Sequence, residues 1–186
     1  HIPNVRYAND RLDLDGTLKA NVFDGTVQVS GLAMERPFGT APTLSADIVL
    51  DDMDLQSLTE VFGFGEITGA LDGSIRQLRL VDWSAQSFNA ELHTDPAWKG
   101  RQRISQRAVQ DLSSVGGNAG GLGNSLQAQA LKLFDDFGYR QIGISCRLAE
   151  EVCEMDGLSS AANSFSIVQG SGLPRLSVVG FNRRVD

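Results

Sequence analysis

The sequence predicts an α+β protein, mainly antiparallel β, in which a strongly curved, taco-like sheet carries an inserted pair of amphipathic helices. Two observations predict the sheet: apolar and polar residues alternate along most of the chain, and many of the 20 glycines fall inside the alternating runs. A third predicts the helices, because apolar residues recur every three or four positions within 99–138. The 186 residues suit one domain. We expect 1–98 to form the curved sheet with one short helix, 99–138 the helical pair and 139–186 the C-terminal strands.

Residues 12–31 are predicted to form a hairpin. Apolar residues alternate before and after Asp24-Gly25, and this pair favours the type I′ turn that joins two antiparallel strands. The alternation returns over 44–50, which predicts the next strand.

A short helix is predicted after this strand. Leu55, Leu58 and Phe62 are spaced three and four residues apart and would form its buried face. Asp54 is a favourable N-cap, and Gly63 is a residue type that commonly ends a helix, so these two residues should bound it.

Strands resume over 67–80 and 88–92. A one-residue slip in the alternation before Leu78 predicts a β-bulge. Glycines recur in nearly every predicted strand, where they mark bends, and they predict a curved sheet that encloses apolar space. In the alternative interpretation the protein's own helices fill this space. The strand glycines are Gly16, Gly25, Gly31, Gly69, Gly73, Gly143, Gly170 and Gly180.

Two helices joined by the glycine-rich link 116–123 are predicted in the middle of the chain. Each has apolar residues at intervals of three or four. They contain Ile104, Ala108, Leu112 and Val115 in the first helix, and Leu126, Ala130, Leu133 and Phe137 in the second. Strands are predicted again over 139–148, 152–157, 164–170 and 175–181.

The two cysteines lie on adjoining predicted strands. A turn centred on Ala149-Glu150 places Cys146 directly opposite Cys153, at a Cβ separation of about 4.5–5.5 Å in a regular antiparallel pair. This is slightly wider than a disulfide needs, so a bridge requires local adjustment of the ladder. We expect a cross-strand disulfide, and hence an oxidising compartment; two buried free thiols are the alternative.

The composition argues against several function classes. The chain carries 16 Lys and Arg against 23 Asp and Glu, a net charge of −7, and lacks a basic stripe with interleaved aromatics, so nucleic-acid binding is not expected. No apolar run approaches the ~20 residues of a membrane-spanning helix. One basic cluster forms either a contact with anionic lipid head groups or a solvated loop and helix start: Lys99, Arg101, Arg103 and Arg107.

No pattern for catalysis is present. His93 is the only internal histidine and no serine lies in a Gly-x-Ser-x-Gly elbow, so a Ser-His-Asp hydrolase is not expected. The stretch 116–123 lacks the Lys-Ser/Thr ending of a phosphate-binding loop. We expect no enzymatic activity, no cofactor and no metal site.

Several segments have a recognisable order and spacing. They are Leu-Thr-Glu-Val-Phe-Gly-Phe-Gly-Glu-Ile-Thr-Gly-Ala-Leu-Asp-Gly (58–73), Leu-Arg-Leu-Val-Asp-Trp (78–83), Arg-Ile-Ser-Gln-Arg-Ala-Val (103–109), Ser145-Cys146 with Val152-Cys153-Glu154-Met155, Gly-Leu-Pro-Arg (172–175) and Asn-Arg-Arg-Val (182–185). In these segments the chain resembles the C-terminal region of YdbH-type proteins, members of the AsmA-like group that also contains the TamB type.

The resemblance implies an elongated β-strand trough, folded like a taco shell, whose apolar interior carries phospholipid acyl chains between the two membranes of a Gram-negative envelope. It implies a periplasmic location, a parent protein anchored in the inner membrane by its N-terminus, and docking of a small outer-membrane lipoprotein of the YnbE type by strand addition. The absence of an initiator Met and of a signal segment at His1 agrees with the C-terminal piece of a longer chain.

Two sets of residues would carry this function. The lipid groove would be lined by Leu44, Ile48, Leu71, Ile75, Leu78, Leu80, Phe88 and Leu92. The partner strand would present Arg175, Leu176, Val178, Val179 and Phe181. That strand is either an exposed edge or already paired within the domain.

The alternative function is that of a structural and interaction domain. Its helices would close the trough, and its only binding site would be the C-terminal edge strand. The core would then be filled by Leu126, Leu133, Phe134 and Phe137.

Overall fold

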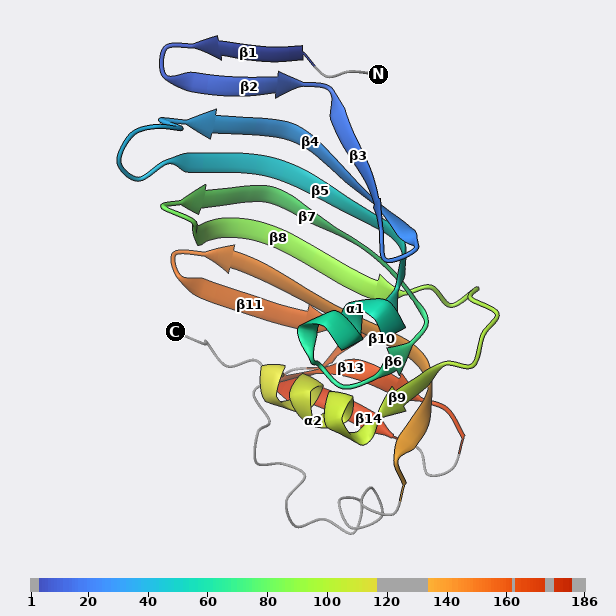
Figure 1. Cartoon of the computed structure of the whole chain (residues 1–186). Coiled ribbons are helices and arrows are strands. Elements are labelled where there is room, and N and C mark those ends of the chain that lie inside the picture. The colour runs from blue at the N-terminus through green and yellow to red at the C-terminus, as the bar shows by residue number, and fades with distance from the viewer. Residues whose placement is uncertain (1–3, 117–133, 162, 173–175, 182–186) are drawn as a thin grey trace.

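The computed structural model describes residues 4–116, 134–161, 163–172 and 176–181. These residues form one 14-stranded antiparallel sheet, which is not closed, and two helices (Figure 1). The predicted mainly antiparallel α+β fold is confirmed. The strands are β1 (Asn4–Ala8), β2 (Arg11–Asp15), β3 (Thr17–Val22), β4 (Gly25–Glu35), β5 (Thr43–Asp54), β6 (Ile67–Thr68), β7 (Ala70–Val81), β8 (Ser84–Thr94), β9 (Arg103–Ser105), β10 (Asp136–Ala149), β11 (Val152–Gly157), β12 (Ser159–Ala161), β13 (Ser164–Gly170) and β14 (Ser177–Phe181), and the helices are α1 (Leu55–Phe62) and α2 (Gln106–Val115).

Most strands pair with strands that are close in the sequence. The order across the sheet is β1-β2-β4-β5-β7-β8-β10-β13-β12. In addition, β3 pairs with β4, β11 with β10 and β14 with β13, while β9 pairs with both β6 and β10. The long connection from β8 to β10 contains β9 and α2.

Four hairpins turn through two residues that both have positive φ, the geometry of a type I′ turn. The predicted pair Asp24-Gly25 is wrong by one residue, because Gly25 is already the first residue of β4 and faces Val22. Glycine is required there by space: a Cβ atom on Gly25 would lie 2.6 Å from the carbonyl oxygens of Asp51 and Asp52. The four turn pairs are Asn9–Asp10, Phe23–Asp24, Asp82–Trp83 and Glu150–Glu151.

Two β-bulges in the middle of the sheet are each held by an aspartate of the neighbouring strand. The bulge predicted within 67–80 is confirmed: β7 has an extra residue, Gln77, opposite Asp47 of β5. Gln77 has a φ of 54°, and its N–H donates to the Asp47 carboxylate at 2.7 Å. In the second bulge the extra residue is Asp52 of β5, whose N–H donates to the carboxylate of the opposing Asp72 at 2.8 Å. Each carboxylate replaces a ladder hydrogen bond that the bulge removes.

Helix α1 begins and ends where the sequence predicts. The Asp54 carboxylate accepts a hydrogen bond from the Ser57 N–H of the first turn at 2.8 Å, and Gly63 ends the helix with a φ of 64°. The expected buried face is partly wrong, since Phe62 is 73% exposed. Thr59 is buried instead, and its hydroxyl donates a hydrogen bond to the Leu55 carbonyl of the same helix at 2.8 Å.

The predicted helical pair is confirmed only for α2, which Ser105 caps at its N-terminus. Ile104 and Phe137, predicted within the pair, lie instead in β9 and β10 and face each other. Both side chains are buried, and the three residues of β9 are too few to show a strand alternation in the sequence. Outside the described residues lie the other positions of the second predicted helix: Leu126, Ala130 and Leu133.

The hydrophobic core lies at one end of the sheet, where both helices pack. The first half of β10 pairs there with β9 and β13, whereas its second half continues between β8 and β11. Phe134, a candidate core residue, is 45% exposed and does not belong to the core. The core consists of Leu55, Ile67, Ile104, Ala108, Val109, Leu112, Phe137, Tyr139, Ile142, Phe165, Ile167, Val168, Leu176 and Val178.

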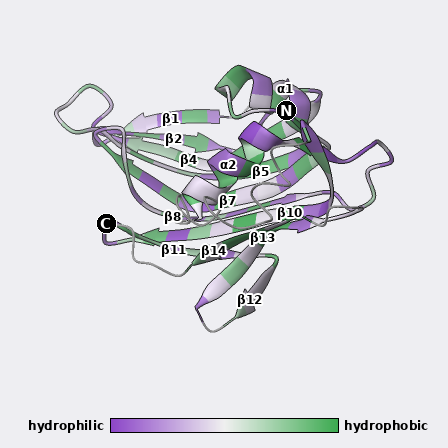
Figure 2. Ribbon diagram, turned by 90° about the horizontal axis from the view of Figure 1, so that it is seen from below, coloured by the Kyte–Doolittle hydropathy of each residue, from purple (hydrophilic) through white to green (hydrophobic). Residues whose placement is uncertain are grey.

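The C-terminal strands complete this end of the sheet. The predicted strands over 152–157 and 164–170 are β11 and β13. The last predicted strand, 175–181, is described as β14 from Ser177. The short strand β12 was not predicted; it pairs with β13 and lies at the bottom of Figure 2.

Replacing Tyr139 by Phe is expected to lower the free energy of unfolding by about 1–2 kcal/mol near pH 7. The Tyr139 hydroxyl donates to the Thr68 carbonyl at 2.6 Å, and the variant leaves that carbonyl without its partner. Burial raises the pKa of Tyr139 above its ordinary value of 10.0, so above about pH 10 the group ionises more readily in the unfolded chain. The contribution of the neutral Tyr139 hydroxyl to the free energy of unfolding is complete below about pH 10 and is lost as the pH rises further.

Urea unfolding of both proteins at pH 7 and at about pH 11 tests this expectation. The difference in free energy of unfolding between the native protein and the Tyr139→Phe variant should be smaller at the higher pH. A gap of equal size at both values would contradict it.

Candidate functional site

The eight residues predicted to line a groove lie on one face of the sheet, which we call the apolar face. Directly paired residues point to the same face of a sheet, and Leu44 faces Leu80 while Ile48 faces Ile75. Alternation along the strands and the pairing across β5, β7, β8 and β10 place the others on this face as well: Leu71, Leu78, Phe88 and Leu92.

The Gln77 bulge keeps the apolar face continuous along β7. Ile75 and Leu78 are three residues apart, and in a regular strand they would point to opposite faces. With the extra residue between them, Ile75 faces Ile48 and Leu78 faces Ala46, two positions of β5 that share a face. The bulge therefore decides which side of β7 is apolar.

The apolar face extends beyond the predicted residues on both sides. Toward the N-terminus, Leu44 faces Met34, Met34 faces Leu12, and Leu12 faces Tyr7. Toward β10, Leu92 faces Ile144. Alternation in the sequence revealed these strands, but it does not encode which strands pair, so these residues were missed as neighbours of the groove candidates.

The apolar face is only half-buried, in contrast to the core. All eight predicted residues have intermediate exposure, and of these only Leu71 packs against the core. In the described part of the chain, α1 lies against β5 and β6 and α2 lies against β9 and β14, at the core end of the molecule. Among the described residues, the apolar side chains of this face shield one another and remain partly exposed.

The opposite face of the same strands is polar. It carries a cavity of about 790 Å³ over β7, β8, β10 and β11. Arg147 and Glu154, which pair across β10 and β11, are among its lining residues, together with Arg76 and Glu91. Charges of both signs suit water and small polar solutes rather than acyl chains.

Cys146 and Cys153 form the predicted disulfide, and the free-thiol alternative is wrong. The predicted register is also wrong, since Cys146 faces Met155 and Cys153 faces Leu148. The turn lies one residue later than expected, so the cysteines are diagonal neighbours on the apolar face. Their Cα atoms are 5.7 Å apart, within the range that a disulfide spans.

Most of the predicted partner strand pairs and packs within the protein itself. β14 pairs with β13, and Leu176 and Val178 are 2% and 3% exposed in the core. Val179 is half-buried, Phe181 is 44% exposed, and the Phe181 N–H donates to the Gly116 carbonyl at 3.0 Å. Arg175 lies outside the described residues. Within them, β13 is the only strand that pairs with β14, so β14 is an edge strand.

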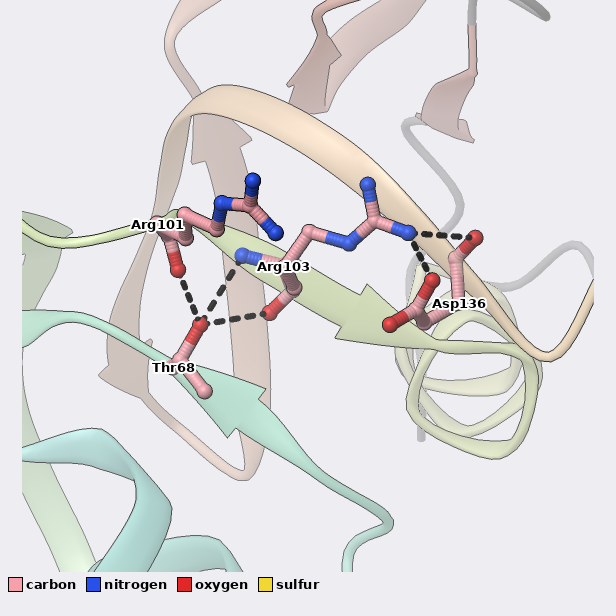
Figure 3. Close-up of polar contacts among 4 residues, drawn as sticks. All are labelled: Thr68, Arg101, Arg103 and Asp136. Atoms are coloured by element: carbon pink, nitrogen blue, oxygen red, sulfur yellow. Dashed lines mark hydrogen bonds and ion pairs between the residues drawn. The ribbon is translucent and has the colours of Figure 1, made fainter.

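The basic cluster is tied into the fold around β9. The Thr68 hydroxyl donates to the Arg101 carbonyl at 2.6 Å and accepts from the Arg103 N–H at 2.9 Å (Figure 3). The Arg103 guanidinium forms an ion pair with Asp136. This pairing of Arg103 favours the solvated loop and helix start over a head-group site.

The part of the chain that the structure describes offers neither a metal-binding cluster nor a membrane-spanning helix. No group of three or more His, Cys, Asp or Glu side chains is placed there to hold a metal ion. Neither α1 nor any other described helix has the length and hydropathy to cross a membrane. Comparisons of the chain with family models, with curated proteins and with solved structures gave no match.

Proposed function

We propose that the chain is a non-enzymatic lipid-transfer module of the Gram-negative periplasm. The apolar face holds the acyl chains of phospholipids that move between the inner and outer membranes. The chain is the C-terminal end of a longer protein of the YdbH type, anchored in the inner membrane, in which the sheet is curved like a taco shell. At its own end it docks a small outer-membrane lipoprotein of the YnbE type by strand addition to β14.

One observation carries this proposal: the apolar face is continuous over β2, β4, β5, β7, β8 and β10, yet it is only half-buried. Seven of the eight predicted groove residues lie outside the core cluster and its packed neighbours. A contiguous, partly exposed apolar surface of this kind is typical of a site for an apolar partner.

Acyl chains match the chemistry of this face. Transfer of each methylene group from water to an apolar surface contributes about 0.8 kcal/mol, so a long chain gains affinity from contact with Leu, Ile and Phe side chains alone. The predicted groove residues carry no hydrogen-bonding side chain, so the face would bind chains without selecting a head group. Such binding suits the transfer of mixed phospholipids.

The disulfide supports an extracytoplasmic location. Cys146 and Cys153 are bonded, and stable disulfides form in oxidising compartments such as the bacterial periplasm. The pair lies on the apolar face beside Met155 and Leu148, where it also holds β11 against β10.

A photo-crosslinking experiment in cells tests the proposal. A photoreactive amino acid in place of Ile48, which faces Ile75 on the apolar face, is expected to form adducts with phospholipid. Leu78→Asp and Phe88→Asp should each abolish these adducts, because a carboxylate on the face must be desolvated when a chain covers it. Mass spectrometry of the purified protein measures the adducts.

Ser74→Asp is the matched control, since Ser74 lies on the polar face of β7 and lines the polar cavity. It adds the same charge to the same strand and should leave the adducts unchanged. Unchanged adducts in the Leu78→Asp and Phe88→Asp proteins would refute the acyl-chain site.

A second candidate function is a structural and interaction domain whose binding is confined to β14. The specific observation in its favour is the closed core at this end, which already contains Leu176 and Val178 of the C-terminal segment. Failure of the lipid crosslink at Ile48, together with capture of a lipoprotein strand by β14, would select this second function.

A further inference from the structure

Three exposed aromatic side chains lie along one margin of the sheet. Phe38 is 89% exposed in the loop between β4 and β5, Trp83 is 66% exposed in the turn between β7 and β8, and Tyr7 is 56% exposed near the end of β1. Figure 1 shows the β1–β2, β4–β5 and β7–β8 connections at the same margin, on the left. We call these three residues the aromatic margin.

Backbone hydrogen bonds join the three connections to one another. The Arg36 N–H of the β4–β5 loop donates to the Asp10 carbonyl of the β1–β2 turn at 2.7 Å. The Asp82 N–H of the β7–β8 turn donates to the Pro42 carbonyl of the β4–β5 loop at 2.9 Å. Linked connections therefore carry Phe38 and Trp83, while Tyr7 lies near the end of β1 beside the first of the two type I′ turns.

The charges near the aromatic margin are largely balanced. Arg11 forms ion pairs with Asp13 at 2.8 Å and with Glu35 at 2.9 Å. The Tyr7 hydroxyl donates to the Asp10 carboxylate at 3.1 Å. A partner of this margin is therefore recognised by aromatic rings and not by an excess of positive charge.

We propose that the aromatic margin inserts into the interfacial zone of a lipid surface whose head groups are zwitterionic. Trp and Tyr concentrate at this zone because their rings have an apolar body and a polar edge. Three exposed aromatic side chains, two on adjacent connections and one near the end of β1, suit a flat lipid surface better than they suit a groove for a peptide.

The apolar face ends at the same margin. Leu12 and Leu80 are each close to one of the turns, and Leu44 follows the β4–β5 loop. Insertion of the aromatic margin would place lipid chains beside the open end of the apolar face. The insertion itself does not require the apolar face to hold a lipid, so the two proposals can fail separately.

The chain has 2 tryptophans, Trp83 and Trp98. The first experiment uses the Trp98→Phe variant, in which Trp83 is the remaining tryptophan. This protein is expected to sediment with phosphatidylcholine–phosphatidylethanolamine vesicles at low and at high salt alike. Brominated acyl chains in the vesicles should quench the fluorescence of Trp83. Failure of the full chain to bind these vesicles would overturn the proposal and leave a protein contact as the role of the margin.

The second experiment removes the rings. Phe38→Ser and Trp83→Ser should each lower the vesicle partition coefficient about tenfold, which corresponds to the loss of one partly buried aromatic side chain. Phe62→Ser is the matched control, because Phe62 is 73% exposed on α1 at the core end, and it should leave binding unchanged. Equal losses in the control and in the margin variants, or binding that needs anionic lipid and disappears in salt, would overturn the proposal.

Leu78→Asp separates this proposal from the acyl-chain site. The variant is expected to lose lipid adducts on the apolar face and still bind vesicles. Loss of vesicle binding in Leu78→Asp, with full binding by Phe38→Ser and Trp83→Ser, would assign the lipid contact to the apolar face and overturn the margin.

Discussion

Phe165→Ala is expected to lower the free energy of unfolding by about 3–5 kcal/mol, the range for truncating a buried aromatic side chain. Phe165 is 1% exposed, and its ring packs so closely on Gly180 that a Cβ atom there would lie 2.3 Å from a ring carbon. β13, which carries Phe165, pairs with β12 on one side and with β14 on the other, and this leaves the cavity little room to collapse. Urea unfolding followed by circular dichroism measures the change.

Phe88→Ala is the control, because Phe88 is a half-buried side chain of the same type on the apolar face. It should cost about 1 kcal/mol or less, as side chains outside a packed core usually do. Equal losses in the two proteins would mean that the apolar face is covered as tightly as the core, and would contradict an open site.

Replacing both cysteines by serine is expected to lower the free energy of unfolding by about 2 kcal/mol, from the loss of a constraint on the unfolded chain. Cys146 and Cys153 have a sequence separation of 7, so the loop that they close is short and the expected value lies toward the lower end for disulfides. Removal of the bridge also frees β11, which pairs only with β10 in the described residues, to separate from the sheet.

Unfolding of the native chain with and without a reductant measures the same quantity. The reduced native protein and the double Cys→Ser variant should have similar stability. If reduction changed nothing, the disulfide would carry no stability, and its support for an oxidising compartment would be lost with it.

Local patterns predicted those parts of the fold that local forces determine. The alternation located most strands, and the helix α1 was correctly bounded because Asp54 and Gly63 act on the nearest turn of backbone. The bulge at Gln77 was visible as a slip in the alternation, since one extra residue exchanges the two faces of a strand.

Features that depend on pairing could not be predicted in this way. Phe137 has helical spacing from residues before it, yet it lies in a strand because it pairs with Ile104, which is distant in the sequence. The predicted pairing of the cysteines was wrong because the turn lies one residue later than expected. Its two residues, Glu150 and Glu151, both adopt positive φ although neither is glycine. Side-chain alternation alone does not select between adjacent turn positions.

The sequence showed which apolar residues of β5, β7 and β8 share a face, but it did not show how far this face extends across neighbouring strands. The eight apolar side chains of β5, β7 and β8 follow from alternation. Their continuation through Met34 and Leu12, and the exposure of Phe38 and Trp83 at one margin, arise from strand order and loop geometry. These are tertiary properties, which local patterns in a single sequence do not reveal.

The order of strands also sets the route by which the chain assembles. Hairpins with two-residue turns close in about 1–10 µs, because little loop entropy opposes them. The pairing of Leu92 with Ile144 instead closes a loop that contains α2 and the whole connection between β8 and β10. That closure brings β10 to the sheet, and β10 carries Phe137, Tyr139 and Ile142 of the core. We therefore expect this loop closure to be slower than the formation of the hairpins, because loop entropy opposes long-range pairing more strongly.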